Sequence, residues 1–241
     1  MTLFLTSSPC VIGAPRCILT PANGFVRRLK EHLPKYPRML VICADPEDHE
    51  MTVRFATDFF IAFREASIPL GGFSVLDGTT ADEASFLVTS NDLIVLMGGH
   101  VPTQNKFFQQ IRLRDLLWNY PGVIMGISAG TMNAASTVYA QPELTGESVN
   151  PKYERFIPGL GLTDVNILPH YQQVKDMILD GVGLYEDITL PDSKGRTFYA
   201  LPDGSYLLRE EDGTEVFYGE VYRVKDGIME WLTRDGEHLQ L

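Results

Sequence analysis

The stretch VIMGISAGTMNAAS, from Val123 to Ser136, decides the fold and the chemistry expected of this chain. Its apolar start follows the breaker pair Pro121-Gly122 and predicts a short buried strand. The residues from Thr131 to Ala135 predict the first turns of a helix. Ser128 therefore falls on a tight turn between a strand and a helix.

Such a turn holds a serine hydroxyl at the carboxyl end of the strand. It often needs a strained or left-handed backbone, and the flanking Gly126 and Gly130 relieve the crowding. The N–H groups that follow lie at a helix N-terminus and can face an oxyanion. The pattern Gly-x-Ser-x-Gly thus predicts that Ser128 is a nucleophile, although a turn of small packed residues fits the same five letters.

Strand and helix signals alternate along the first two thirds of the chain. Expected strands are Leu3–Leu5, Arg38–Ala44, Gly71–Asp77, Asp92–Gly99 and the run that begins at Val123. Expected helices are Asp48–Ala66, Thr80–Ser90 and Thr103–Asn119, the last with Thr103 as its N-cap. This rhythm of apolar strands and amphipathic helices predicts an α/β fold, with a parallel sheet covered on both faces.

The rhythm changes after about Tyr139, where a long segment rich in Pro, Gly and charge predicts a loop. From Thr197 on, Asp-Gly pairs separate short β-like runs, which predicts a series of β-hairpins. These pairs are Asp203-Gly204, Asp212-Gly213, Asp226-Gly227 and Asp235-Gly236. We expect one domain over residues 1–241, with a β-rich C-terminal extension over about 197–241.

Composition and charge exclude several classes of protein. The chain has 241 residues, of which 44% are hydrophobic and 21% charged, as in ordinary globular domains. Its net charge of −11 argues against a nucleic-acid partner. No segment approaches the roughly 20 apolar residues of a membrane span. We expect no nucleic acid and no membrane as partners, while a homo-oligomer stays open.

The cysteines and the N-terminus indicate a cytoplasmic location. Cys10, Cys17 and Cys43 form no Cys-x-x-Cys pair, so we expect neither a disulfide framework nor a zinc site. The N-terminus lacks a basic start, and the segment Thr6–Pro9 cuts its apolar run too short for a signal peptide. Because the chain also lacks a His-Glu-x-x-His motif, we expect no metal and no other cofactor.

An activated serine needs a general base and a group that orients this base. Of the five histidines, His32 and His49 lie in early helices and are expected to be solvated. His170, which follows the strand-like Asn-Ile-Leu-Pro run, is the predicted base; capping of the next helix is its structural alternative. Asp203 follows another strand-like run and is the predicted acid, although Pro-Asp-Gly is also a natural turn. Glu143 and Asp164 stay open as alternative orienting groups.

The oxyanion hole needs two N–H donors near the serine. Ala129 directly follows Ser128 and supplies one donor. Gly99 ends the neighbouring strand and supplies the other, although Gly98-Gly99 is also compatible with a simple turn. Three polar residues after this pair are candidates for contact with the substrate, namely His100, Thr103 and Gln104.

Four motifs, in order, resemble those of the peptidase E (aspartyl dipeptidase) family, which includes cyanophycinase-like enzymes. They are LMGGHVPTQNKFF, GISAGTMNAA, NILPHYQ and YALPDGSYLL. The resemblance implies a flavodoxin-like parallel-sheet sandwich, similar to class I glutamine amidotransferases, with serine replacing their cysteine. It also implies Ser128 as nucleophile, His170 as base, and Gly99 and Ala129 as oxyanion hole. Asp203 matches the acid in some accounts of the family, while others place the acid between serine and histidine.

One departure from this family concerns specificity. Aspartyl dipeptidases carry an arginine soon after the catalytic histidine, where this chain has only Lys175. Because bidentate carboxylate recognition favours Arg over Lys, a strict preference for N-terminal aspartate is not expected. Arg54, Arg155 and Arg196 are the alternative cations.

The expected function is that of a serine hydrolase that cleaves a small, dipeptide-like amide through an acyl-enzyme. Two alternatives stay open. An α/β-hydrolase-type esterase would use Ser128, Asp203 and His238, in the order of that fold. A non-catalytic protein of the amidotransferase-like fold would bind ligands without turning them over.

Overall fold

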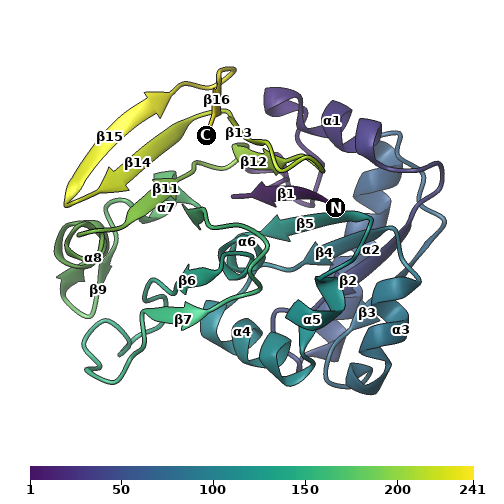
Figure 1. Cartoon of the computed structure of the whole chain (residues 1–241), viewed down its shortest axis with the longest axis horizontal. Coiled ribbons are helices and arrows are strands. Elements are labelled where there is room, and N and C mark those ends of the chain that lie inside the picture. Colours follow the sequence, from purple (N-terminus) through teal and green to yellow (C-terminus); the bar gives the residue numbers. More distant parts are fainter.

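The chain forms a large mixed sheet with helices on both faces and a smaller sheet beside it (Figure 1). The computed structural model describes residues 1–241. The large sheet has eight strands in the order β16-β13-β12-β1-β5-β4-β2-β3. Its strands are β1 (Thr2–Thr6), β2 (Arg38–Ile42), β3 (Gly72–Leu76), β4 (Leu93–Leu96), β5 (Val123–Ile127), β12 (Tyr206–Arg209), β13 (Glu215–Tyr218) and β16 (His238–Gln240).

The five strands from β1 to β5 are parallel to one another, as the alternation of strands and helices predicts. Strands β12, β13 and β16 extend the sheet in antiparallel fashion beyond β1. The helices are α1 (Phe25–His32), α2 (His49–Glu65), α3 (Ala84–Thr89), α4 (Val101–Gln110), α5 (Leu113–Leu117), α6 (Ala129–Asn133), α7 (Tyr171–Val174) and α8 (Leu190–Asp192). Short 3-10 turns η1 (Ala22–Gly24) and η2 (Ala81–Glu83) and a π-helical segment η3 (Leu184–Thr189) complete the helical elements.

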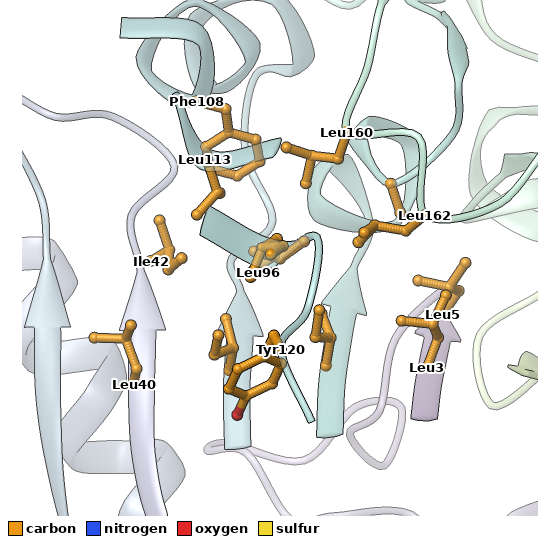
Figure 2. Close-up of a cluster of buried hydrophobic side chains, with 14 of the residues drawn as sticks. Leu3, Leu5, Leu40, Ile42, Leu96, Phe108, Leu113, Tyr120, Leu160 and Leu162 are labelled. Atoms are coloured by element: carbon orange, nitrogen blue, oxygen red, sulfur yellow. The ribbon is translucent and has the colours of Figure 1, made fainter. Parts of the chain in front are cut away.

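Side chains of the central strands alternate between two apolar layers, as the pleat of a strand requires. On β1, Leu3 and Leu5 join a cluster of 26 buried residues, whereas Phe4 joins a cluster of 20 on the opposite face. Figure 2 shows the first layer, where Phe108 of α4 and Leu113 of α5 cover the strands. Helices α1 and α2 cover the other face. Because both faces are buried, the strands are continuously apolar rather than alternating.

The small sheet has the order β15-β14-β11-β8 and comes from the second half of the chain. Its strands are β8 (Asn166–Leu168), β11 (Thr197–Ala200), β14 (Val221–Lys225) and β15 (Ile228–Thr233). Two-stranded pairs are formed by β6 (Thr137–Tyr139) with β7 (Phe156–Pro158), and by β9 (Ile178–Leu179) with β10 (Val182–Gly183). A third apolar cluster joins α6 to the small sheet through Met132, Leu168 and Phe198. This cluster fixes the small sheet against the helix that follows Ser128.

The four Asp-Gly pairs play two different roles. Asp212-Gly213 and Asp226-Gly227 each join two antiparallel strands as β-hairpin turns. At the latter, both residues have positive φ, 51° and 81°, as a type I′ turn requires. Asp203-Gly204 and Asp235-Gly236 instead carry the chain from the small sheet to the large one.

The helix expected over Thr103–Asn119 is observed with an earlier start and a break in its middle. It begins at Val101 with Pro102 in the first turn, where a missing N–H is tolerated, and its N-cap is His100 rather than Thr103. It breaks into α4 and α5 because Arg112 adopts a left-handed conformation with φ 53°.

The expectation that the cysteines form no disulfide is wrong for Cys10 and Cys17. These two residues are disulfide-bonded, with their Cα atoms 5.3 Å apart, while Cys43 is a buried free thiol. The chain folds back between them, and Val11 N–H donates to Ile18 O at 2.8 Å. The residues between the two cysteines show no alternation of apolar and polar side chains that would predict a hairpin. The bond could therefore not be predicted from the spacing of the cysteines.

None of the helices combines the length with the apolarity that crossing a membrane demands.

Candidate active site

Ser128 occupies a strained turn between β5 and α6. Its φ of 51° and ψ of −112° lie outside the regions that non-glycine residues ordinarily adopt. Such conformations cost on the order of 1–3 kcal/mol and occur where the surrounding structure enforces them, often at active sites. The Ser128 N–H donates to Thr6 O, at 3.2 Å, at the end of the adjacent strand β1. The turn is therefore held from the neighbouring strand.

The two glycines that bracket Ser128 allow close approach of backbone segments. A Cβ on Gly130 would lie 2.3 Å from Leu96 O of β4, and one on Gly126 would lie 2.8 Å from Thr131 Cα. Neither glycine has positive φ, so neither is required for left-handed geometry. Because these glycines have no side chains, α6 can start directly against β4 and β5. This close packing explains why small residues surround the serine.

The small sheet brings His170 and Asp203 together. Strands β8 and β11 are parallel neighbours with Leu168 opposite Ala200, and the two site residues follow shortly after these strand ends. His170 Nδ1 lies 2.7 Å from Asp203 Oδ1. Because the carboxyl ends of parallel strands share one edge of a sheet, adjacent strands deliver the two side chains to the same place.

Asp203 is a buried carboxylate with several hydrogen-bond donors. Its side chain is 5% exposed, and Oδ1 also accepts from Ser7 Oγ at 2.7 Å. Oδ2 accepts from Gln172 Nε2 at 2.6 Å and from Gln173 Nε2 at 2.8 Å. Burial alone raises the pKa of Asp203, but the hydrogen bond and charge of His170, with the bonds from Ser7 and Gln172, outweigh it and lower the pKa. The group is therefore an anion that can orient the His170 ring.

The nucleophile and the histidine both contact the end of β1. Thr6 O accepts from Ser128 N–H at 3.2 Å, and the hydroxyl of the next residue, Ser7, accepts from His170 N–H at 2.7 Å. No hydrogen bond joins Ser128 Oγ to His170 in this structure. With Nδ1 bound to Asp203, Nε2 is the ring nitrogen that is left to receive a proton. Catalytic hydrogen bonds are often long before substrate binds.

The expected oxyanion donors lie next to Ser128. Ala129 is the first residue of α6, so its N–H has no acceptor inside the helix. Gly98 packs against the serine, because a Cβ there would lie 3.2 Å from Ser128 Cβ. Gly99, the next residue, fits against Ala44, where a Cβ would approach Ala44 Cβ to 2.5 Å. The N–H groups of Gly99 and Ala129 make no hydrogen bond to another backbone group. They are thus available to an oxygen of a bound molecule.

Gln104 does not fit the expected role in substrate contact. The residue is completely buried, and its Nε2 donates to Met97 O at 2.8 Å and to Cys43 O at 3.1 Å. Its Oε1 accepts from Asn133 Nδ2 at 3.1 Å. With donors and acceptor engaged in the interior, Gln104 holds the loop after β4 rather than facing a ligand.

His100 and Thr103 remain near the surface at the start of α4. The two side chains lie 2.7 Å apart, and His100 Nε2 lies 2.8 Å from Glu147 Oε1. Burial of Glu147 is outweighed by the N–H groups of Leu144 and Glu143 and by His100, so the pKa of Glu147 is lowered. This contact attaches the long loop after β6 to the N-terminus of α4.

Neither alternative acid is a partner of His170. Glu143 lies near the Val101 N–H and the Glu147 carboxylate. Although the residue as a whole is exposed, protein atoms crowd its carboxyl group, and this loss of hydration, with the charge of Glu147, raises the pKa of Glu143 to about 7. Asp164 lies at the surface, lining a separate cavity with Arg209 and Glu215.

The other histidines lie away from Ser128. His238 is on β16, four strand spacings from β5, which is about 19 Å at the usual interstrand distance. It cannot act as base for Ser128, which removes the α/β-hydrolase arrangement. His49, expected to be solvated, is half-exposed and pairs with Asp77 at 2.7 Å. His32, also expected to be solvated, is mostly covered and pairs with Glu210 at 2.9 Å.

Two cavities bracket the sheet at opposite ends. One of about 480 Å³ lies beside the candidate site, between the Cys10 hairpin and the turn at Asp203, and is lined also by Gln172. A larger cavity, about 830 Å³, opens at the amino ends of the strands, near Thr2 and Val123. Size alone would favour the second cavity. The first carries Asp203 at the sheet edge where ligands of open α/β sheets bind, but neither Ser128 nor His170 lines it.

Sequence reasoning missed Ser7, Gln172 and Gln173, which contact Asp203. The two glutamines directly follow the predicted base in the run His-Tyr-Gln-Gln, and their amide groups were a usable signal. Ser7 follows β1 at the same sheet edge, but its role depends on β1 lying beside β5, which one sequence does not reveal.

Solved structures share this fold across nearly the whole chain. A peptidase from an acI-B1 Actinobacterium matches with a TM-score of 0.64 and 18% identity, over 100% of this chain and 96% of its own. A putative peptidase E protein from Listeria monocytogenes EGD-e matches with a TM-score of 0.56 and 19% identity, over 96% of this chain and 98% of its own. At these identities, the likeness demonstrates the fold.

The sequence comparisons identify the family. No curated protein matches the chain in sequence. The model of peptidase family S51 matches residues 54–217, about two thirds of the chain, a range that contains Ser128, His170 and Asp203. The chain therefore belongs to peptidase family S51 and is a serine-type peptidase.

Proposed function

We propose that this peptidase cleaves small, dipeptide-like substrates with Ser128 as nucleophile, His170 as general base and Asp203 as the orienting acid. The observation that carries the proposal is the His170 Nδ1–Asp203 Oδ1 contact of 2.7 Å, which Thr6 and Ser7 at the end of β1 link to the strained turn of Ser128. Gly99 and Ala129 are the proposed oxyanion donors, and neither N–H is used by another backbone group.

The reaction follows from these positions. His170 Nε2 removes the proton of Ser128 as Oγ attacks the scissile carbonyl carbon, and the carbonyl oxygen becomes an oxyanion facing the Gly99 and Ala129 N–H groups. Asp203 holds the proton on Nδ1 and stabilises the imidazolium that forms. The imidazolium then gives its proton to the leaving amine, and an acyl-enzyme results. Water, activated by the same ring, releases the acid and restores Ser128.

The surroundings of the site support a substrate with a free amino terminus. Glu143 and Glu147 place two carboxyl groups at the start of α4, a few residues after Gly99. An ammonium group is a donor that such acceptors bind. The loop that carries them is fixed to the N-cap residue His100 at 2.8 Å. We assign to this acidic pair the recognition of the substrate's α-ammonium group, which restricts cleavage to the end of a peptide.

The site has no cationic side chain free to bind an acidic side chain on the N-terminal residue of the substrate. Lys175 is half-exposed and lies 3.8 Å from Asp176. Arg155 pairs with Asp192 at 3.0 Å, and Arg196 stacks on the Phe156 ring at 4.2 Å. Arg54 lies on the exposed face of α2, beside Met51. A buried substrate carboxylate without a fixed cation is costly, so neutral N-terminal residues are the proposed preference.

A panel of dipeptides and their N-acetylated forms tests the proposal. Free dipeptides should be hydrolysed by the parent protein and not by Ser128→Ala, and acetylation of the amino group should abolish or strongly reduce turnover. Equal hydrolysis of free and acetylated forms would remove the exopeptidase assignment and leave the nucleophile assignment standing. Hydrolysis by the Ser128→Ala protein would remove both.

A further inference from the structure

The residue that follows strand β1 contacts both the histidine and the aspartate of the candidate site. Ser7 is completely buried. Its hydroxyl donates to Asp203 Oδ1 at 2.7 Å and accepts from the backbone N–H of His170, also at 2.7 Å. A serine hydroxyl has one proton and two lone pairs, so this single group can make both bonds at once.

The backbone of His170 is in a conformation that needs such support. Its φ of 57° and ψ of 29° are left-handed, a conformation that is unfavourable for a residue with a Cβ. Four hydrogen bonds hold the backbone of this turn. The His170 N–H donates to Ser7 Oγ, the Tyr171 N–H donates to Leu201 O, and His170 O accepts from the N–H groups of Gln173 at 2.8 Å and Val174 at 3.1 Å. The Ser7 contact is the only one of the four made by a side chain, and the same oxygen also reaches Asp203.

The position of Ser7 also connects the histidine to the nucleophile. Thr6, one residue earlier, accepts from the Ser128 N–H at 3.2 Å and from Thr131 Oγ1 at 2.8 Å. Two consecutive residues of one strand end therefore hold the Ser128 turn through a carbonyl and the His170 turn through a hydroxyl. The large sheet carries the serine and the small sheet carries the histidine. Thr6 and Ser7 therefore link the two sheets at the site.

The geometry points to Ser7 as a positioning residue that sets the placement of the His170 ring relative to Ser128. This inference rests on the proposed roles of Ser128 and His170. Ser7 is completely buried, and its hydroxyl is engaged by Asp203 and the His170 N–H, so the role assigned to it requires no contact with substrate and no proton transfer. It acts by fixing the His170 backbone and one oxygen of Asp203, and a misplacement of about 1 Å in such a pair costs on the order of 100-fold in rate.

Kinetics of Ser7→Ala test the inference. We expect kcat for a good dipeptide substrate to fall about 10- to 100-fold with KM changed by less than about threefold, because the binding groups stay in place. Ser7→Thr keeps a hydroxyl and should recover most of the loss. Ser7→Cys keeps a side chain of similar volume, but its thiol is a weak donor, so this variant should not recover kcat. If the Ala variant does not fold, the comparison of the Cys and Thr variants tests the inference. Ser8→Ala is the control, because the Ser8 hydroxyl contacts only Cys10 N–H at 3.4 Å.

A double-mutant cycle with His170→Ala separates positioning from general stability. If Ser7 acts through His170, adding Ser7→Ala to the His170→Ala protein should lower the residual kcat by no more than about twofold. The same fold loss in both backgrounds, or a kcat of Ser7→Ala within twofold of the parent, would overturn the inference. Failure of the proposed function would appear separately, as turnover by Ser128→Ala.

Discussion

His170 Nδ1 and Asp203 Oδ1 lie 2.7 Å apart although 33 residues separate them in the chain. The two residues follow β8 and β11, which are parallel neighbours in the small sheet. Ser7 and Ser128 follow β1 and β5, which are parallel neighbours in the large sheet. Two pairs of adjacent strand ends thus supply every group of the proposed mechanism except the Gly99 donor, which follows β4. In Figure 1 the arrowheads of β1 and β5 point toward the side of the molecule that carries α6, α7 and β11.

The identity of the acid is tested by comparing two substitutions. Asp203→Asn should lower kcat roughly 10²–10⁴-fold, because an amide in place of the carboxylate favours the wrong tautomer of His170. Glu143→Gln should change kcat far less and act mainly on KM, since the partners of Glu143 are Val101 and Glu147. Steady-state kinetics on one dipeptide decide the matter. A silent Asp203→Asn with a severe Glu143→Gln would make Glu143 the acid.

Stability should depend on pH through Asp203 in a direction set by its lowered pKa. A carboxyl group whose pKa is lower in the folded state stabilises the fold above its unfolded pKa of about 3.9, and this stabilisation is lost as the pH falls through the folded value. The Tm difference between the parent and Asp203→Asn should therefore be larger at pH 6 than at pH 3. Thermal unfolding at the two pH values measures it, and a difference that grows in acid would contradict the sign.

Glu143 should show the opposite sign, because its pKa is raised to about 7. The folded state then binds the proton more tightly, so the fold loses stability as the pH rises from the unfolded pKa of about 4.3 through 7. Glu143→Gln resembles the protonated form. Its Tm should match that of the parent at pH 4 and exceed it at pH 8, and an unchanged Tm at pH 8 would contradict the raised pKa.

Specificity is predicted from the absence of a free arginine near the site. Asp-Leu should not be favoured by more than about tenfold in kcat/KM over Asn-Leu or Ala-Leu, a gap of about 1.4 kcal/mol. A preference above a hundredfold would mean that a cation reaches the substrate. Arg54, Arg155 and Arg196 would then be replaced by alanine one at a time. The variant that lacks the responsible arginine should lose kcat/KM for Asp-Leu and keep it for Asn-Leu and Ala-Leu.

Gly130 should tolerate no side chain. Its Cβ would lie 2.3 Å from Leu96 O, a backbone atom, so Gly130→Ala must move α6 away from β4. We expect a destabilisation of about 1–3 kcal/mol, as for overpacked sites, together with a loss of kcat from displaced Ala129 N–H. Gly183→Ala is the control, because its Cβ would meet side-chain atoms rather than backbone, with Asp187 Oδ2 nearest at 3.1 Å and Glu186 Cβ at 3.7 Å. Denaturant unfolding of both proteins gives the comparison, and equal stabilities would contradict the packing argument.

Much of the fold could be predicted because its signals are local. Apolar runs and breakers identified the parallel strands, and their order of appearance predicted an α/β sheet with helices on both faces, which the structure confirms. Ser128, His170 and Asp203 stand out in the sequence because each follows a strand-like run. Their approach to one another depends on which strands are neighbours, and a single sequence does not contain that information.

The missed features have different origins. Ser7 has no motif of its own and matters only because β1 lies beside β5 and its end meets His170. Gln104 looked available because it follows the Gly-Gly pair, yet α4 begins two residues earlier than expected and directs its side chain into the interior. The Cys10–Cys17 bond depends on a chain reversal without a periodic signal.

Covalent labelling of the serine is the most direct test of the central claim, which is that Ser128 is an activated nucleophile served by His170. The parent, Ser128→Ala and His170→Ala proteins would be treated with a small fluorophosphonate and analysed by intact mass and peptide mapping. We predict one adduct on Ser128 in the parent, none in Ser128→Ala, and labelling slowed at least about 10³-fold in His170→Ala. An adduct on another residue, or a labelling rate that does not depend on His170, would contradict the account.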